Sequence, residues 1–389
     1  MFKKLITVAL MSAMVLTMAF TTGCGKKDSS SDSSTLASAT DSTGESTADK
    51  APNKVKVGFI FIGNIKDGGW TQAHYNGLLE MKKNLGLSDS DVLYRENVKE
   101  EKAACKDAIT QLINEGCNVI FTTSFGFMDA TIEVAKEHKD IKFMHCSGYQ
   151  TADNVGTYFG RMYEARYLSG IVAGLKTKTN KIGFIGAVQL PEVISGIDAF
   201  TLGVQSVNKD AVVKVLWLGN WGDPAKEKEL ATALLNDGCD VITQHSDSPG
   251  PQIAAEAKKV FAIGYDLDNR TAAPKAYLTA PIWNWGSYYT EQVKAVQEGT
   301  WKSDAYKGGI KEGILDIAKL SDIAPEGAQA KVDEVKAKIV DGSFEVFKGP
   351  ITAQDGSIKI KDGEAWGYDD VMGKMNWLVK GVDGKIDSK

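Results

Sequence analysis

The segment Asn114-Glu-Gly-Cys-Asn-Val-Ile120 recurs later in the chain as Asn236-Asp-Gly-Cys-Asp-Val-Ile242. In each copy an amphipathic run ends at a glycine, and a short apolar run follows it. Glycine just past the last helical residue is a common helix stop, because it adopts the left-handed conformation without a steric penalty. We therefore interpret the two segments as one helix-to-strand junction built twice, which indicates an internal structural repeat.

Outward from these junctions, short apolar runs rich in β-branched residues alternate with longer amphipathic segments. Runs that do not alternate with polar residues are typical of parallel strands buried on both faces. The pattern therefore predicts two doubly wound, parallel-sheet α/β lobes. In the first half we expect strands over residues 55–62, 92–94, 119–123 and 142–146. In the second half we expect strands over residues 181–186, 212–218, 240–243, 260–264 and 276–279, and a helix over 224–236.

The first residues predict export. Met1-Phe-Lys-Lys precedes an apolar run, residues 5–20, that is too short to span a bilayer and has the length of a signal-peptide core. The run leads into Thr21-Thr-Gly-Cys24, which resembles a lipobox, so we expect residues 1–23 to be a lipoprotein signal peptide and Cys24 to carry the lipid. The alternative is an ordinary secretory cleavage site beside an incidental cysteine.

Residues 24–53 are dominated by small and polar residues, a composition that predicts a disordered tether because it cannot bury a core. The rest of the chain exceeds one typical core. We expect residues 54–160 and about 281–310 to form lobe I, and residues 161–280 and about 311–389 to form lobe II. The net charge of −5, with scattered lysines, argues against a nucleic-acid partner. The chain is expected to act as a monomer, attached to a membrane only through its N-terminal lipid.

The sequence points away from metal and cofactor chemistry. Cys105, Cys117, Cys146 and Cys239 never form a Cys-x-x-Cys pair, and no two histidines have metal-ligand spacing. From the sequence, these cysteines can either form a disulfide or lie buried in the core as free thiols. Motifs for a phosphate loop, a dinucleotide site and a nucleophile elbow are missing. We therefore expect no metal, no cofactor and no catalytic residue.

Ligand sites in doubly wound sheets lie beyond the carboxyl ends of the strands, so the residues after each expected strand are candidates. These segments combine aromatic rings with acids, a set that stacks on a planar ligand and accepts hydrogen bonds from its N–H or hydroxyl groups. Some of the rings are expected to pack in the core instead. His245 either donates a hydrogen bond to the ligand or forms its hydrogen bond with the backbone at the end of a strand. The candidate ligand-binding residues are Asp67, Trp70, Phe125, Phe127, Trp221, His245, Asp247, Asp266, Trp283 and Trp285.

Six short motifs are together specific evidence for a protein family, although each motif alone would be weak evidence. They are Asp67-Gly-Gly-Trp70, Phe125-Gly-Phe-Met-Asp-Ala130, Phe159-Gly-Arg-Met-Tyr-Glu-Ala-Arg-Tyr-Leu-Ser-Gly170, Asp198-Ala-Phe-Thr-Leu-Gly203, Trp221-Gly-Asp-Pro-Ala-Lys226 and Gly264-Tyr-Asp-Leu-Asp268. From about Val55 onward the chain thereby resembles the basic membrane protein, or PnrA-like, family of bacterial lipoproteins, the purine nucleoside receptors of ABC importers. The resemblance implies a type I periplasmic-binding fold, whose two lobes are joined by three crossovers and close by hinge motion.

The resemblance also implies residue roles. Trp70 and Phe200 match residues that stack on the two faces of the purine, and Asp67 and Asp266 match acids that contact its polar edges or the ribose. Nucleoside-binding members commonly place a lysine that reaches the ribose near the position of Trp283. Because this chain has tryptophan there, we expect a purine base in preference to a nucleoside, delivered to ABC permease and ATPase subunits at the extracytoplasmic face of the cell membrane.

Two alternatives stay open. Tryptophan also stacks on sugars, so a sugar or other small-molecule receptor of the same fold is one of them. A nucleoside-processing enzyme is the weaker one, because the chain lacks an aspartate cluster that would bind calcium.

Overall fold

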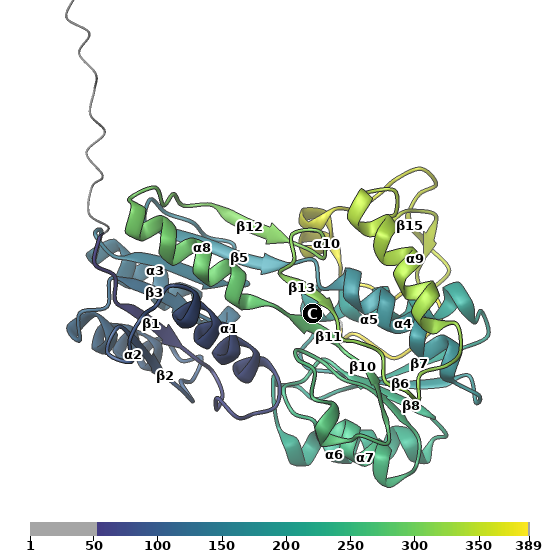
Figure 1. The fold of residues 1–389 in the computed structure, drawn as a ribbon. Coiled ribbons are helices and arrows are strands. Elements are labelled where there is room, and N and C mark those ends of the chain that lie inside the picture. The colour runs from purple at the N-terminus through teal and green to yellow at the C-terminus, as the bar shows by residue number, and fades with distance from the viewer. Residues whose placement is uncertain (1–52, 388–389) are drawn as a thin grey trace, which may run out of the picture. The chain divides into compact units, whose positions relative to one another are not determined.

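The computed structural model describes residues 53–387. The expected signal peptide, Cys24 and nearly all of the expected tether lie outside the described residues. Two six-stranded sheets, each covered by helices, make up the described part of the chain (Figure 1). We call them lobe I and lobe II. This arrangement confirms the predicted pair of parallel-sheet α/β lobes.

Lobe I contains a wholly parallel sheet of order β12-β5-β4-β3-β1-β2. Its strands are β1 (Val57–Ile60), β2 (Val92–Arg95), β3 (Val119–Thr122), β4 (Lys142–Cys146), β5 (Val155–Gly160) and β12 (Ala305–Gly308). Its helices are α1 (Trp70–Asn84), α2 (Lys102–Asn114), α3 (Met128–Glu137) and α8 (Trp285–Glu298), with a 3-10 turn over Phe125–Phe127. Although α8 is far from α1 in the sequence, the two helices lie side by side (Figure 1).

Lobe II contains a second parallel sheet, of order β10-β9-β8-β6-β7-β16. Its strands are β6 (Lys181–Gly186), β7 (Val212–Trp217), β8 (Val241–Gln244), β9 (Phe261–Ile263), β10 (Tyr277–Thr279) and β16 (Val382–Asp383). Its helices are α4 (Tyr163–Lys176), α5 (Pro191–Val207), α6 (Pro224–Asn236), α7 (Gly250–Ala257), α9 (Ala328–Asp341) and α10 (Tyr368–Lys374). Strands β4 and β6 and helix α6 have the bounds expected from the sequence.

The repeated junction has the same geometry in both lobes. Helix α2 ends at Asn114 and α6 at Asn236, and the glycines that follow have φ of +92° at Gly116 and +90° at Gly238. The next backbone N–H folds back onto the helix, with distances of 3.0 Å from Cys117 N to the Leu112 oxygen and 3.1 Å from Cys239 N to the Leu234 oxygen. The interpretation of these segments as a duplicated helix stop is confirmed.

The chain passes between the lobes three times: from β5 to α4, from β10 to α8 and from β12 to α9. Two of these passages pair with each other, because β11 (Pro281–Trp283) and β13 (Leu315–Ile317) form an antiparallel two-stranded ribbon. A second small ribbon joins β14 (Ile351–Thr352) and β15 (Ile358–Ile360). Three adjacent connections restrict relative motion of the lobes to bending about the connecting segments, which is how a hinge closes a cleft.

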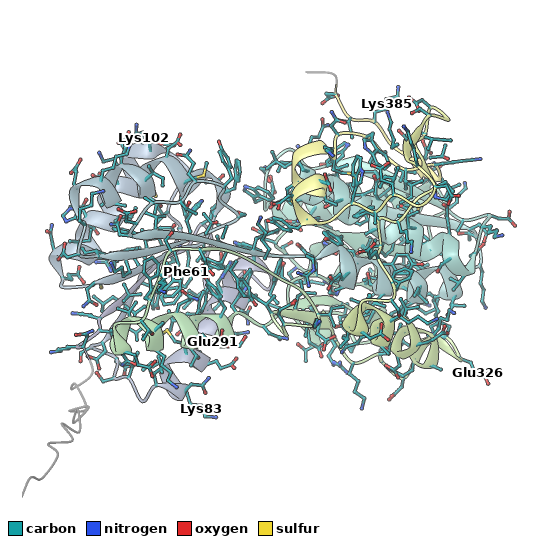
Figure 2. The ribbon with its side chains drawn as sticks, turned by 90° about the horizontal axis from the view of Figure 1, so that it is seen from above. Phe61, Lys83, Lys102, Glu291, Glu326 and Lys385 are labelled. Carbon is teal, nitrogen blue, oxygen red and sulfur yellow. The ribbon has the colours of Figure 1, made fainter. Side chains whose placement is uncertain are left out.

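The largest apolar cluster is continuous through both lobes, and each lobe has in addition a smaller cluster of its own. Figure 2 shows Phe61 inside lobe I, with Lys83, Lys102 and Glu291 on its outside. The four cysteines of the described chain are free and buried, which decides against a disulfide among them. Burial raises the pKa of Cys105 to about 12 and that of Cys239 to about 11, so these thiols stay protonated and unreactive. Within residues 53–387, no helix is long and apolar enough to cross a membrane.

Candidate functional site

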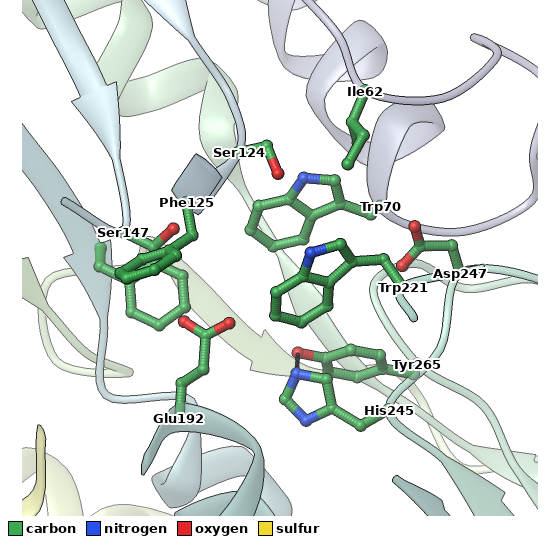
Figure 3. Close-up of a pocket in the computed structure, with 11 residues that line it drawn as sticks. Ile62, Trp70, Ser124, Phe125, Ser147, Glu192, Trp221, His245, Asp247 and Tyr265 are labelled. Atoms are coloured by element: carbon green, nitrogen blue, oxygen red, sulfur yellow. Dashed lines mark hydrogen bonds between the residues drawn. The ribbon is translucent and has the colours of Figure 1, made fainter. Parts of the chain in front are cut away.

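A narrow cavity of about 20 Å³ lies between the two lobes (Figure 3). Lobe I lines it with Ile62, Trp70, Ser124, Phe125, Ser147 and Phe159. Lobe II lines it with Glu192, Trp221, His245, Asp247 and Tyr265. Apart from Phe159, which is part of β5, these residues follow the carboxyl ends of strands in the two sheets. This is the edge at which doubly wound folds bind their ligands.

Five of the candidate residues line this cavity: Trp70, Phe125, Trp221, His245 and Asp247. The other six candidates do not line it: Asp67, Phe127, Phe200, Asp266, Trp283 and Trp285. Five of these six have a local packing or hydrogen-bonding role, and Asp266 is buried without a hydrogen-bond partner for its carboxyl group.

Trp283 and Trp285 lie behind Trp70. Their rings stack on each other with centroids 4.3 Å apart, and both side chains are buried. The Trp70 ring meets this pair edge to face, at 6.0 Å from Trp283 and 5.6 Å from Trp285. The Trp70 indole N–H donates to the Thr123 carbonyl oxygen at 2.8 Å. The two buried tryptophans therefore support Trp70 from behind the cavity wall and do not line the cavity themselves.

Phe127 and Phe200 pack inside their lobes. Phe127 is fully buried in the core that helices α2 and α3 form on the lobe I sheet. Phe200, on α5, is also fully buried and meets Phe184 of β6 edge to face at 5.6 Å. The position of Phe200 therefore disfavours the expected stacking on a purine. The rings that do face the cavity, besides Trp70, are Phe125, Phe159, Trp221 and Tyr265.

The two acids carried over from the family also lie off the cavity wall. The Asp67 carboxylate accepts the backbone N–H groups of Gly69, Thr71 and Gln72 at 2.9, 2.9 and 3.0 Å, so it holds the start of α1. Asp266 is fully buried with a φ of +68°, and neither of its side-chain oxygens accepts a hydrogen bond. Burial raises the pKa of Asp266 well above its ordinary value.

His245 and Tyr265 form one polar edge of the cavity (Figure 3). His245 Nε2 and the Tyr265 hydroxyl are hydrogen bonded at 3.1 Å. Behind them the Arg166 guanidinium covers the Tyr265 ring at 3.7 Å and donates to the Gln244 carbonyl oxygen at 2.9 Å. Burial, followed by the charge of Arg166, lowers the pKa of His245 well below its ordinary value. His245 is therefore a neutral imidazole at physiological pH.

The lobes touch beside the cavity. Glu100 of lobe I accepts from the Ser124 hydroxyl at 2.5 Å and from the Gly126 N–H at 2.7 Å, and it also accepts from the Trp221 indole N–H of lobe II at 3.3 Å. A second bridge runs from the Asn269 side-chain amide of lobe II to the Gly68 carbonyl oxygen of lobe I, at 3.2 Å. The structure therefore represents a closed arrangement of the lobes.

An outer groove of about 500 Å³ continues from the cavity. Cavity and groove share Phe125, Ser147, Phe159 and Glu192. Farther out the groove is lined by Tyr149, whose surface is 73% exposed, and by the ion pair of Lys307 in β12 with Asp369 in α10. The groove therefore adjoins the cavity on the side of Phe125 and Glu192.

Six cavity residues were absent from the candidates: Ile62, Ser124, Ser147, Phe159, Glu192 and Tyr265. Ser124, Ser147 and Tyr265 also follow strand ends, so the strand-end rule could have found them. Glu192 follows β6 by six residues and opens α5, so only the path of the intervening loop brings it to the cavity. The lining as a whole supplies flat rings and uncharged or acidic hydrogen-bonding groups, a set suited to holding a planar polar molecule.

Most of the chain matches known proteins. A family model described as ABC transporter substrate-binding protein PnrA-like matches residues 54–348. A relative named purine-binding protein, from Brucella abortus (strain 2308), is 42% identical over 87% of this chain and 96% of its own length. TsgA13 of Haloferax volcanii, provisionally named an ABC transporter glucose-binding protein, is 33% identical over 86% of this chain and 82% of its own.

Among solved structures, an ABC transporter system solute-binding protein from Aeropyrum pernix K1 superposes with a TM-score of 0.66. The match covers 83% of this chain and 98% of that protein at 18% identity, so it supports the fold alone. The family match and the two sequence relatives go further, since they extend over the lobes and the cavity between them. The chain therefore belongs to the basic membrane protein, or PnrA-like, family of ABC transporter substrate-binding proteins.

Proposed function

We propose that this protein captures a purine, as the free base in preference to the nucleoside, and delivers it to an ABC permease without making or breaking a bond. The observation that carries the proposal is a cavity walled by aromatic rings from both lobes, with Trp70 and Phe125 on one side and Trp221 and Tyr265 on the other. Purines are flat and apolar on their faces and polar along their edges. Each ring that stacks on such a ligand contributes roughly 1 kcal/mol beyond area burial.

The preference for a free base rests on what fills the space behind Trp70. The buried Trp283 and Trp285 occupy that region. The family resemblance implies that nucleoside-binding members commonly place a lysine that reaches the ribose at or beside the position of Trp283. No lysine or arginine is among the described residues that line the cavity. A ribose would need hydrogen-bonding partners on this side, and the two indole rings offer few of them.

A sugar is the second candidate ligand, because the relative TsgA13 carries a glucose-binding name and tryptophan also stacks on sugar rings. The lining favours the purine. Sugars present hydroxyl groups around the whole ring and need many polar partners, whereas here the rings of Trp70, Phe125, Phe159, Trp221 and Tyr265 dominate.

Calorimetric titration tests the ligand. The purified protein would be unfolded and refolded to remove bound ligand, and then titrated with adenine, hypoxanthine, guanine, adenosine, inosine, glucose and ribose. Micromolar or tighter binding of a base, at least tenfold stronger than of the matching nucleoside, supports the proposal. Binding of glucose or ribose with no response to any purine contradicts it.

We further propose that a lipid on Cys24 holds the protein at the outer face of the cell membrane, with the binding lobes beyond a tether. A Cys24→Ser variant should then appear in the soluble fraction or the medium, whereas the unmodified sequence stays with membranes. Equal membrane association of the two proteins would contradict the lipid anchor.

A further inference from the structure

Arg166 is a fully buried arginine of α4 that lies behind the cavity wall. Its guanidinium carbon lies over the ring of Tyr265, 3.7 Å from the centroid, and over the ring of Phe184, at 5.3 Å. Its Nη1 donates to the carbonyl oxygen of Gln244 at 2.9 Å. Gln244 ends β8 directly before His245, and both His245 and Tyr265 line the cavity. One guanidinium therefore supports both residues of the polar edge.

Arg166 and His245 also lie side by side beneath α5. A Cβ atom on Gly196 of that helix would lie 3.4 Å from His245 Nδ1 and 3.6 Å from Arg166 Nε, which are ordinary van der Waals distances. The other ring nitrogen of His245, Nε2, is hydrogen bonded to the Tyr265 hydroxyl at 3.1 Å (Figure 3). The three side chains therefore form one packed unit, of which only the histidine and the tyrosine face the cavity.

Arg166 lacks the partners that make a buried arginine favourable for folding. Among residues 53–387, its Nε and Nη2 have no hydrogen-bond partner, and its Nη1 donates to a backbone carbonyl and not to a carboxylate. Asp266, the acid next to Tyr265 in the chain, is fully buried too, but its carboxyl group accepts no hydrogen bond. A guanidinium stays charged, and a buried charge without an ion pair costs free energy. Because an apolar side chain of similar length would serve the fold at least as well, a role in binding explains Arg166 better.

We propose that Arg166 is a positioning residue for ligand capture. It holds the Tyr265 ring and the end of β8 so that the hydrogen-bonded pair of Tyr265 and His245 faces the ligand. A planar guanidinium can stack on a ring and donate within its own plane at the same time, whereas an ammonium group cannot. The role therefore depends on the shape of the group as well as its charge. The inference rests on the proposed capture of a purine, and it adds a residue that acts on the ligand without lining the cavity.

Two substitutions separate the shape of the guanidinium from its charge. Arg166→Lys keeps the charge but loses the planar group, and Arg166→Met loses both while keeping a long side chain. Each should raise the Kd for adenine about tenfold, and the two Kd values should agree within about threefold. Arg166→Met should leave thermal unfolding without ligand unchanged or shift it to higher temperature, because it removes an unpaired buried charge. A residue needed only for the fold would not lose affinity while keeping stability.

The test is calorimetric titration of the whole purified protein with adenine, and it includes a double-mutant cycle of Arg166→Met with Tyr265→Leu. If Arg166 acts through the ring, Arg166→Met should change Kd by less than about threefold once Tyr265 is replaced. Arg270→Met is the matched control. Arg270 also lies over a tyrosine ring, that of Tyr277 at 5.6 Å, but it pairs with Asp268 at the surface and does not line the cavity. Its replacement should leave the Kd for adenine unchanged.

The outcomes separate the two proposals. If the wild type binds no purine, purine capture and the role of Arg166 in it both fail. If the wild type binds adenine and Arg166→Met binds it equally well, positioning by Arg166 is overturned while purine capture stands. The same conclusion follows if affinity falls only together with the unfolding temperature, or if Arg166→Lys keeps wild-type affinity, since packing or charge alone would then be responsible. An equal effect of Arg166→Met with and without the Tyr265 ring would also contradict the proposal.

Discussion

Replacing Gly69 by alanine should prevent the lobes from closing without harming either lobe. A Cβ atom on Gly69 would lie 1.9 Å from the Asp247 carbonyl oxygen, and real Cβ contacts shorter than 3.0 Å are essentially never seen. The obstacle is backbone of the opposite lobe, so no side-chain rotation relieves it. The lobes must move apart by at least 3.0 − 1.9 = 1.1 Å at this point.

That separation breaks the bridges beside the cavity. The Trp221 indole N–H to Glu100 bond is already 3.3 Å long and the Asn269 to Gly68 bond is 3.2 Å, so neither survives a shift of this size. A typical hydrogen bond contributes about 0.5–1.5 kcal/mol, which gives about 1–3 kcal/mol for the pair. Because these bonds form only in the closed arrangement, the loss appears in ligand affinity, as about a 5- to 150-fold rise in Kd.

The assay has two parts. Calorimetric titration with adenine gives the change in Kd, and small-angle X-ray scattering with and without adenine reports closure as a fall in the radius of gyration. Gly367→Ala is the control, because a Cβ at Gly367 meets nothing within 4 Å. Thermal unfolding without ligand should hardly change in either variant. If Gly69→Ala binds adenine with wild-type affinity and contracts as the wild type does, the lobe contact described here does not form in the liganded protein.

Three further predictions concern single positions. Trp70→Ala should weaken adenine binding at least tenfold by calorimetry, and Trp70→Phe less than about fivefold, because a ring is retained; equal losses would argue against stacking at Trp70. Trp221→Phe keeps an aromatic ring but removes the hydrogen bond to Glu100, so the Kd for adenine should rise about fivefold with no change in thermal unfolding. An unchanged Kd would show that this hydrogen bond does not contribute to closure of the lobes. Gly116→Ala and Gly238→Ala should each lower the free energy of unfolding in urea by roughly 1–2 kcal/mol, since both positions require positive φ, and a neutral result at either would contradict the duplicated helix stop.

The architecture was predictable because its causes are local. Runs such as residues 142–146 and 181–186 are buried on both faces, so their composition reports a parallel strand directly, and both strands have the predicted bounds. The glycines at 116 and 238 mark helix ends for a reason confined to one residue, the left-handed backbone. Shorter or edge strands were less well bounded: β9 spans Phe261–Ile263, within the expected 260–264. Strands β12 and β16, which are late additions to the two sheets, were not predicted because long-range pairing defines them. Strand β5 (Val155–Gly160) was also not among the expected strands, although it is buried along its whole length.

The sequence alone predicted only about half of the residues that line the cavity. The strand-end rule found Trp70, Phe125 and Trp221, but it could not tell a ring that faces the cavity from one that supports it, as Trp283 and Trp285 do. That distinction depends on side-chain direction and on which layer of rings lies outermost, and neither is encoded in spacing along the chain.

By itself, the sequence determined two parallel-sheet lobes, their duplicated junction, the family and the edge of the sheets at which a ligand lies. Strand burial, helix termination and chain order follow from neighbouring residues, so they can be read locally. Only the tertiary structure decided which side chains meet across the lobes. Glu192 reaches the cavity, Asp67 turns to the start of α1 and Gly69 touches the opposite backbone because three separate crossovers bring distant segments together. Such contacts depend on the packed arrangement of both sheets, which no single segment specifies.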